Sequence, residues 1–420
     1  MRSSLQSIFR QHFPAFSQTR TLHVREWRAA SAIINCHSAA LGGYVLACPD
    51  GHHSETHYYA CRHRSCPRCA QGPRQQWVQA ELHKLLACAH FHCIFTLPHD
   101  FLALWEYNRA WTNKLLFDCA RTSLLELCAD PRYLGATPGL LMALHTWGRT
   151  LSLHPHVHCL ISAGGLDATH QWRACKADYL VSVQALSALF RGKCLAHLSH
   201  ALAHQRLHLP PQQDAQHWRQ CIRRQYTKHW NIELSKPYAH GRGVALYLAR
   251  YVKGGPLGQE RTLRVNDHGV HFDYTDHRDG QHKHMTLQTD AFIGRVLWHA
   301  PVQGQHLVRH CGLYASAAKA HQRKAVAALQ PVSMPQSQEP LACHTASEQS
   351  TSVQRCPRCT QALVRTSSVL PAHRFGEISI ARLSGTPSRI GPTGRPSGQT
   401  PVSDNGVLRR RSLRRCSPLN

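Results

Sequence analysis

The sequence predicts an α+β fold in three parts: a small Cys/His-rich module, a larger core of helices and strands, and a basic tail of low complexity. Residues 36–69 are dense in Cys and His, whereas residues 90–325 mix helical apolar periodicity with strand-like apolar runs. After about residue 330, Ser, Thr, Pro, Gly and Arg dominate, and such a segment buries too little apolar surface to offset its ordering entropy. The expected units are an N-terminal arm (1–30), the Cys/His module (31–89), the core (90–325) and a disordered basic tail (326–420).

The charge balance points to a polyanionic partner. Among 420 residues, 49 Lys and Arg face 23 Asp and Glu, so the formal net charge is +26. Nucleic acid is the first candidate for such a partner. A membrane surface is disfavoured, because no run approaches the roughly 18 apolar residues of a spanning helix and no basic amphipathic helix dominates.

The first residues and the cysteines predict a compartment. "MRSSLQSIFRQHFPAFSQTR" lacks the continuous apolar core of a secretory signal, although its acid-free composition faintly resembles a mitochondrial presequence. The 18 cysteines include two CPRC motifs, which favour metal thiolates in a reducing compartment over a disulfide framework. We therefore expect a cytoplasmic, nucleoid-associated prokaryotic protein.

Apolar spacing orders the elements of the core. A helix is expected from Pro73, a good first helical residue, and "HFHCIFTLP" predicts a strand that ends at Pro98. Asp100 is the expected N-cap of the next helix. The other expected elements are helices over about 101–128, 180–206, 215–235 and 290–300, a hairpin that turns near Gly148, and short strands over 262–288.

The Cys/His module has the ligand types of a structural zinc site. Cys66-Pro-Arg-Cys69 is a tight knuckle in which two thiolates can bind one tetrahedral ion. Cys48 and His52 are the first-ranked partners of this pair, and Cys61 is next. The alternative is a set of buried free thiols.

Arginines crowd the same module. Arg62, Arg64 and Arg68 surround the knuckle, and a small metal-stapled domain of this kind can contact a phosphate backbone. Farther along the chain, a second zinc site is a candidate among four residues, Cys343, His344, Cys356 and Cys359.

The segment "LSLHPHVHCLI" places three histidines in an apolar strand. Side chains alternate along a strand, so His154, His156 and His158 share one face while Val157 and Cys159 point to the other. Such imidazoles can clamp a divalent metal. Chance is the alternative, because a chain with 34 His produces same-face pairs that are only ordinary core or surface histidines.

A later helix carries a pair of tyrosines. In "VALYLARYVK", Tyr247 and Tyr251 are four residues apart, so they are neighbours at the edge of the apolar sector, on the side of Arg250. They are either ordinary amphipathic-edge residues or nucleophiles for phosphodiester chemistry. A tyrosine hydroxyl has a pKa near 10, so attack on DNA needs a cation that polarises the phosphate.

Several motifs occur together in one order. They include "ALGGYVLACPDGHH", "CRHRSCPRC", "FHCIFTLPH", "LHTWGRTLSLHPHVHCLISAGGL", "HGRGVALYLARYVKGGP" and "GLYA". Over roughly residues 36–320 the chain resembles the two-tyrosine rolling-circle transposases of the bacterial insertion sequence 91 family, within the H-U-H endonuclease superfamily. The chain departs from many relatives at the segment "CPDGHH", which begins at Cys48. At this place those relatives carry C-x-x-C.

The resemblance implies a fold, two kinds of metal and a chemistry. It implies a zinc-binding domain followed by an H-U-H core, an antiparallel sheet with helices on one side and His156 and His158 on a central strand. These two histidines would bind catalytic Mg or Mn, and Tyr247 and Tyr251 would form 5′-phosphotyrosine links. The implied substrate is single-stranded DNA at element ends, with host replication proteins as candidate partners.

The motifs do not assign every role in this implied site to one residue. The third metal ligand is not fixed by the motifs, and His154, His145 and His240 are the candidates. Arg250 and Lys253, on the tyrosine helix, are candidate DNA contacts.

Three alternatives compete with a two-tyrosine rolling-circle transposase. A replication initiator or relaxase would use the same nicking chemistry on another substrate. A non-catalytic zinc-dependent DNA-binding protein would explain the charge and the cysteines, but it would leave the histidines and tyrosines idle. A transposase of the acidic-triad type is disfavoured, because no convincing carboxylate cluster accompanies the motifs.

Overall fold

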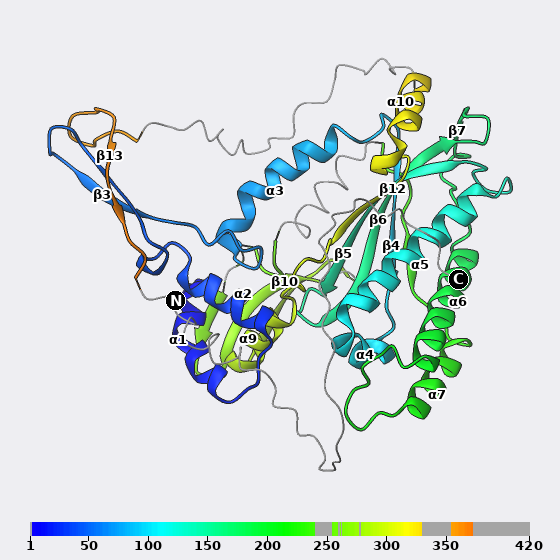
Figure 1. The fold of residues 1–420 in the computed structure, drawn as a ribbon, viewed down its shortest axis with the longest axis horizontal. Helices are drawn as coiled ribbons and strands as arrows, with labels where there is room; N and C mark the ends of the chain where they lie inside the picture. Colours follow the sequence, from blue (N-terminus) through cyan, green and yellow to red (C-terminus); the bar gives the residue numbers. More distant parts are fainter. Residues whose placement is uncertain are drawn as a thin grey trace, which may run out of the picture.

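The computed structural model describes residues 2–239, 254–258, 261, 263–276, 279–329 and 354–372. These residues form three antiparallel sheets with associated helices, which confirms the predicted α+β fold (Figure 1). Among the described helices, none has both the length and the apolar content needed to cross a bilayer.

The largest sheet forms the centre of the core. Its strand order is β12-β5-β6-β4-β8, with β7 paired to β6, and all described pairings are antiparallel. The implied central position of the histidine strand is confirmed, since β6 lies between β5 and β4 (Figure 1). The strands are β4 (His90–Thr96), β5 (Thr137–Trp147), β6 (Leu153–Leu166), β7 (Trp172–Ala174), β8 (Ile232–Leu234) and β12 (Val308–Gly312).

Helices cover one face of this sheet (Figure 1). They are α4 (Leu102–Tyr107), α5 (Arg109–Ala129), α6 (Val183–Ala203) and α7 (Ala215–Gln225). Phe95 of β4 and Val157 and Cys159 of β6 are fully buried in the core beneath them, as strand alternation requires. The histidines lie on the opposite face, which also carries a smaller apolar cluster that includes Leu160 of β6 and Ala325 of α10.

The N-terminal residues form packed helices rather than the expected arm. α1 (Leu5–Gln18) begins at a Ser4 capping box and buries Leu5, Ile8, Phe9, Phe13 and Phe16 at helical spacing. These side chains share a core with Phe272 and Phe292, far along the chain. The elements of this unit are α1, α2 (Val24–Asn35), β1 (Arg2–Ser3), β9 (Leu263–Asn266), β10 (Gly269–Thr275), β11 (His282–Leu287) and α9 (Thr289–Trp298).

The third sheet joins distant parts of the chain. It has the order β13-β2-β3, so a strand from the expected tail lies beside the Cys/His module (Figure 1). The strands are β2 (Gly43–Ala47), β3 (Ser54–Tyr58) and β13 (Val364–Val369). The remaining elements are η1 (Ala39–Leu41), α3 (Pro67–Leu82), η2 (His99–Phe101), η3 (Ser316–Ala318) and α10 (Lys319–Ala328).

Three predicted boundaries differ from the structure. Helix α3 begins at Pro67, with Cys66 as N-cap, rather than at Pro73, because the knuckle itself starts the helix. Asp100 lies inside η2 and its carboxylate accepts from Gln225 and Lys228, so it caps no helix. Helix α7 ends at Gln225.

The sheet-to-helix core predicts the effect of one truncation. Phe95 is 0% exposed and its ring lies 4.9 Å from that of Phe190. Phe95→Ala should therefore lower the free energy of unfolding by about 3–5 kcal/mol, through lost burial and a residual cavity. The measurement is urea unfolding, with Tyr107→Ala as control, because Tyr107 is 49% exposed and its loss should change stability by less than about 1 kcal/mol.

Candidate functional site

Three histidines meet on the face of the central sheet opposite α4, α5, α6 and α7. His156 and His158 lie two residues apart on β6, and His145 of β5 is the cross-strand partner of His156. Their ligand atoms all lie within 4.8 Å of one another, and the side chains are buried. The ring centroids of His145 and His158 are 4.1 Å apart. Three nitrogen donors at this spacing can bind one divalent ion.

Hydrogen bonds orient two of these rings. His156 donates its Nδ1–H to the carbonyl oxygen of His154, which leaves Nε2 as its ligand atom. The Nδ1 of His158 lies 2.8 Å from Nε2 of His92 on β4, and the two rings stack at 5.0 Å. A metal-binding histidine normally has such an outer partner on its second nitrogen. His92 therefore supports the orientation of His158.

Burial favours the neutral form of His145 and His158. Desolvation lowers the pKa of His158 well below its usual range, and the neighbouring imidazoles His145 and His156 lower it further. Desolvation likewise lowers the pKa of His145, and it lowers that of His92 to about 4. The neutral imidazole is the form that binds metal, so the site is ready for an ion at neutral pH.

The other predicted residues of this site fall in two groups. His154 is not part of the three-histidine group, although its ring lies 4.9 Å from that of His156 and 5.8 Å from that of His99. His240, Tyr247, Arg250, Tyr251 and Lys253 lie outside the residues that the structure describes.

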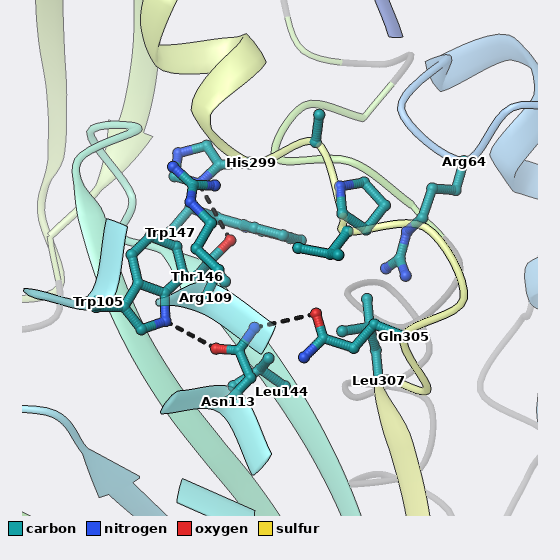
Figure 2. Close-up of a pocket in the computed structure, with 13 residues that line it drawn as sticks. Arg64, Trp105, Arg109, Asn113, Leu144, Thr146, Trp147, His299, Gln305 and Leu307 are labelled. Atoms are coloured by element: carbon teal, nitrogen blue, oxygen red, sulfur yellow. Dashed lines mark hydrogen bonds between the residues drawn. The ribbon is translucent and has the colours of Figure 1, made fainter. Parts of the chain in front are cut away.

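A small cavity lies at the end of β5. Its volume is about 20 Å³, and Arg64, Arg109 and Trp147 are among the residues that line it. Figure 2 shows Arg64 entering from the side opposite Trp105. Burial lowers the pKa of Arg64 to about 10, and its guanidinium donates to the carbonyl of Gly254 at 3.4 Å. Of the predicted DNA contacts, Arg62 and Arg68 are exposed whereas Arg64 reaches this cavity.

The cysteines form a first cluster around the knuckle. It contains Cys36, Cys61, Cys66 and Cys69, whose sulfurs lie within 4.8 Å of one another. The Sγ of Cys69 is 3.4 Å from that of Cys36 and 3.5 Å from that of Cys61. Four sulfurs around one tetrahedral zinc, at about 2.3 Å each, would be about 3.8 Å apart. The donor set and its spacing fit a structural zinc ion.

A second cluster contains two of the residues that were predicted to bind zinc together with the Cys66–Cys69 knuckle. Cys48 and His52 gather with Cys356 and Cys359, not with Cys66 and Cys69. The predicted single site is thus divided, because β2 and β3 carry Cys48 away from the knuckle and toward β13. Cys343 and His344, once candidates beside Cys356 and Cys359, lie outside the described residues.

Comparison with known proteins identifies the family. A family model described as "Putative transposase" matches residues 139–322, and one described as "Transposase zinc-binding domain" matches residues 8–97. "Putative transposase y4qJ" of Sinorhizobium fredii (strain NBRC 101917 / NGR234) is 34% identical over 86% of this chain and 94% of that relative. The chain belongs to the insertion sequence 91 family of transposases.

A second relative agrees with this assignment. "Transposase for insertion sequence element IS801" of Pseudomonas savastanoi pv. phaseolicola is 31% identical over 69% of this chain and 70% of that relative. No solved structure matches. The three-histidine group of the transposase lies in the first matched region and its Cys36 cluster in the second, whereas Cys356 and Cys359 lie beyond both.

Sequence reasoning missed two participants, Cys36 and His92, and left a third, His145, open. Cys36 lies inside the predicted module, but β2 and β3 separate it from the knuckle in sequence, so spacing did not mark it as a ligand. His92 shares its strand face with His90 in "HFHCIFTLP", a same-face pair like that of β6, which could have marked it. His145 was one of three candidates, and the β5–β6 register singles it out.

His90 itself is held by a structural network. Its Nδ1–H donates to the carbonyl of Cys88 at 2.8 Å, and its Nε2 accepts from the hydroxyl of Tyr314 at 2.6 Å. That hydroxyl accepts in turn from the Leu86 amide. The network joins the "FHC" strand to the "GLYA" segment, and burial lowers the pKa of His90 to about 4.

This pKa predicts a pH dependence of stability. As pH falls from about 6.5 toward 4, the unfolded state binds a proton at His90 that the folded state does not, so the free energy of unfolding falls. The contribution is about 3 kcal/mol, lost across that window and fully present above it. Chemical unfolding of the wild type and of His90→Gln at several pH values measures it. Equal slopes in the two proteins would contradict the assignment.

Proposed function

We propose that this transposase moves DNA by a rolling-circle route, cleaving single-stranded element ends through tyrosine nucleophiles beside a metal held by His145, His156 and His158. The observation that carries the proposal is the group of three buried imidazoles on one sheet face, in a member of this transposase family. Tyr247 and Tyr251 are the proposed nucleophiles.

The proposed reaction is a transesterification. The phenol oxygen of Tyr247 or Tyr251 attacks the scissile phosphorus, and the bond to the 3′ oxygen breaks. The tyrosine proton leaves to solvent and the 3′ oxygen gains one, so a 5′-phosphotyrosine and a free 3′-OH result. A 3′-OH then attacks the phosphotyrosine in the reverse sense, which joins new strands and frees the tyrosine. The second tyrosine would serve the second cleavage.

The chain's own residues set the conditions for this step. His145, His156 and His158 would each offer Nε2 to the ion, which when bound would polarise the phosphate and stabilise charge on the leaving oxygen. His92 and the His154 carbonyl hold two of these rings in place. Both Mg and Mn remain in the proposal, but three nitrogen donors favour Mn, because Mg prefers oxygen ligands.

The DNA-contacting residues are part of the same proposal. Arg62 and Arg68 are exposed beside the first cysteine cluster, where their charges can contact phosphates. Zinc bound by Cys36, Cys61, Cys66 and Cys69 would fix the loop that carries Arg62 and the start of α3, which carries Arg68. Arg250 and Lys253 are proposed to contact DNA next to the tyrosines.

Covalent capture tests the nucleophiles. Single-stranded element ends incubated with the protein and Mn should give a protein–DNA adduct that resists denaturing electrophoresis. Tyr247→Phe/Tyr251→Phe should abolish it, because phenylalanine lacks the attacking oxygen. Tyr226→Phe is the matched control, because this tyrosine is 47% exposed and lies at the C-terminal end of α7. An adduct of normal yield in the double variant would disprove the assignment.

Metal binding tests the histidine group separately from cleavage. His158→Ala should weaken Mn binding by at least about tenfold, measured by electron paramagnetic resonance of free Mn, since one of three ligands is lost. Strand cleavage should fall in parallel. His204→Ala, an exposed histidine, should change neither. Wild-type Mn affinity in His158→Ala would remove this site from the proposal.

A further inference from the structure

We infer that Cys48, His52, Cys356 and Cys359 bind a second zinc ion that fastens the segment 354–372 to the β2–β3 hairpin. The four ligand atoms lie within 4.8 Å of one another, although Cys48 and His52 are separated from Cys356 and Cys359 by about three quarters of the chain. The Sγ of Cys48 is 3.4 Å from that of Cys359 and 3.9 Å from Nδ1 of His52. Three thiolates and one imidazole are a common tetrahedral zinc set.

The backbone around Cys356 is shaped as a metal knuckle. The amide of Arg358 donates to the Sγ of Cys356 at 3.4 Å, and that of Thr360 donates to the Cys356 carbonyl at 2.8 Å. An amide donated to sulfur stabilises a thiolate, which is the form that binds zinc. The turn thus prepares Cys356 and Cys359 to bind together.

The opposite side of the cluster is a second tight turn. The Gly51 amide donates to the Cys48 carbonyl at 2.9 Å, and Gly51 has φ +72°, a conformation that glycine adopts without strain. This turn brings His52 back to Cys48. It explains how "CPDGHH" can supply two ligands without a second cysteine.

Apolar burial does not account for the pairing of β13. Five of its six residues are exposed, and only Val369 is half-buried. Among the described residues, none from β2, β3 or β13 belongs to the buried members of the three hydrophobic clusters. A three-stranded sheet without a hydrophobic face is not expected to be stable alone. A metal ion is a usual substitute for a core in so small a unit.

Few side-chain contacts support the sheet. Arg365 lies over the ring of Tyr44 at 5.1 Å and donates to the hydroxyl of Tyr59 at 3.1 Å. Exposed contacts of this kind contribute little stability. The metal site is therefore the main link between β13 and the hairpin, and it is independent of the proposed strand cleavage.

Counting zinc tests the inference in the full-length protein. Native mass spectrometry is performed in a His156→Ala/His158→Ala background, so that the histidine group does not contribute. We expect two zinc ions per chain. The Cys356→Ser/Cys359→Ser variant should hold one zinc ion. Cys48→Ser should lose the same ion, so the triple variant Cys48→Ser/Cys356→Ser/Cys359→Ser should also hold one zinc ion. Cys175→Ser, outside both clusters, should retain two.

Hydrogen exchange locates the lost ion. In Cys356→Ser/Cys359→Ser the amides of β2 should exchange faster, because β13 no longer pairs with them, whereas those of β6 should not change. Unchanged β6 exchange shows that the variant is folded. The inference would be overturned if this variant held two zinc ions. It would also be overturned if the variant held no zinc ion while the amides of β6 stayed protected from exchange. Unchanged exchange of the β2 amides would likewise overturn it.

Discussion

The period-two alternation of β6 is the constraint on which the rest of the structure depends. One face of this strand buries Val157, Cys159 and Ile161 in the core under the helices. The other face must then carry His156 and His158, because a shift of one residue would exchange the two sets. The apolar face thus sets the direction of the imidazoles. The positions of these imidazoles are therefore fixed by packing within the sheet rather than by a flexible loop.

Burying imidazoles on a sheet has an energetic cost that shapes their surroundings. A charged histidine in this position would be desolvated next to two others, so His145 and His158 favour the neutral form. Neutral imidazoles still need partners for their polar atoms, and His92 and the His154 carbonyl supply two of them. The requirement for buried hydrogen bonds and the requirement for oriented metal ligands are met by the same contacts.

Local pattern predicted much of the fold, and tertiary proximity explains what it did not predict. The β4 strand, the β5–β6 hairpin, the faces of His156 and Val157, and a cysteine knuckle at Cys66 all follow from spacing within a few residues. Strand order and register determine which histidine joins β6, and a single sequence contains neither. For this reason His145 could only be one of three candidates.

The cysteines show the same limit more strongly. Spacing assigns neither Cys36 to the Cys66 knuckle nor the Cys356–Cys359 pair to Cys48 and His52, because each meets its cluster through a change of chain direction. The packed helix α1 was missed for a related reason. Its apolar stripe is regular, but part of the core that it packs into, including Phe272 and Phe292, follows about 250 positions later.

The first cysteine cluster and the histidine group are linked through Arg64. This residue lies in the loop between Cys61 and Cys66, so the cluster fixes its backbone on both sides. Its guanidinium reaches the cavity lined by Thr146 and Trp147, which directly follow His145 on β5 (Figure 2). The positive charge of Arg64 also contributes to the lowered pKa of His145. A change in the geometry of the cysteine cluster must therefore move a cation that lies beside the histidine group.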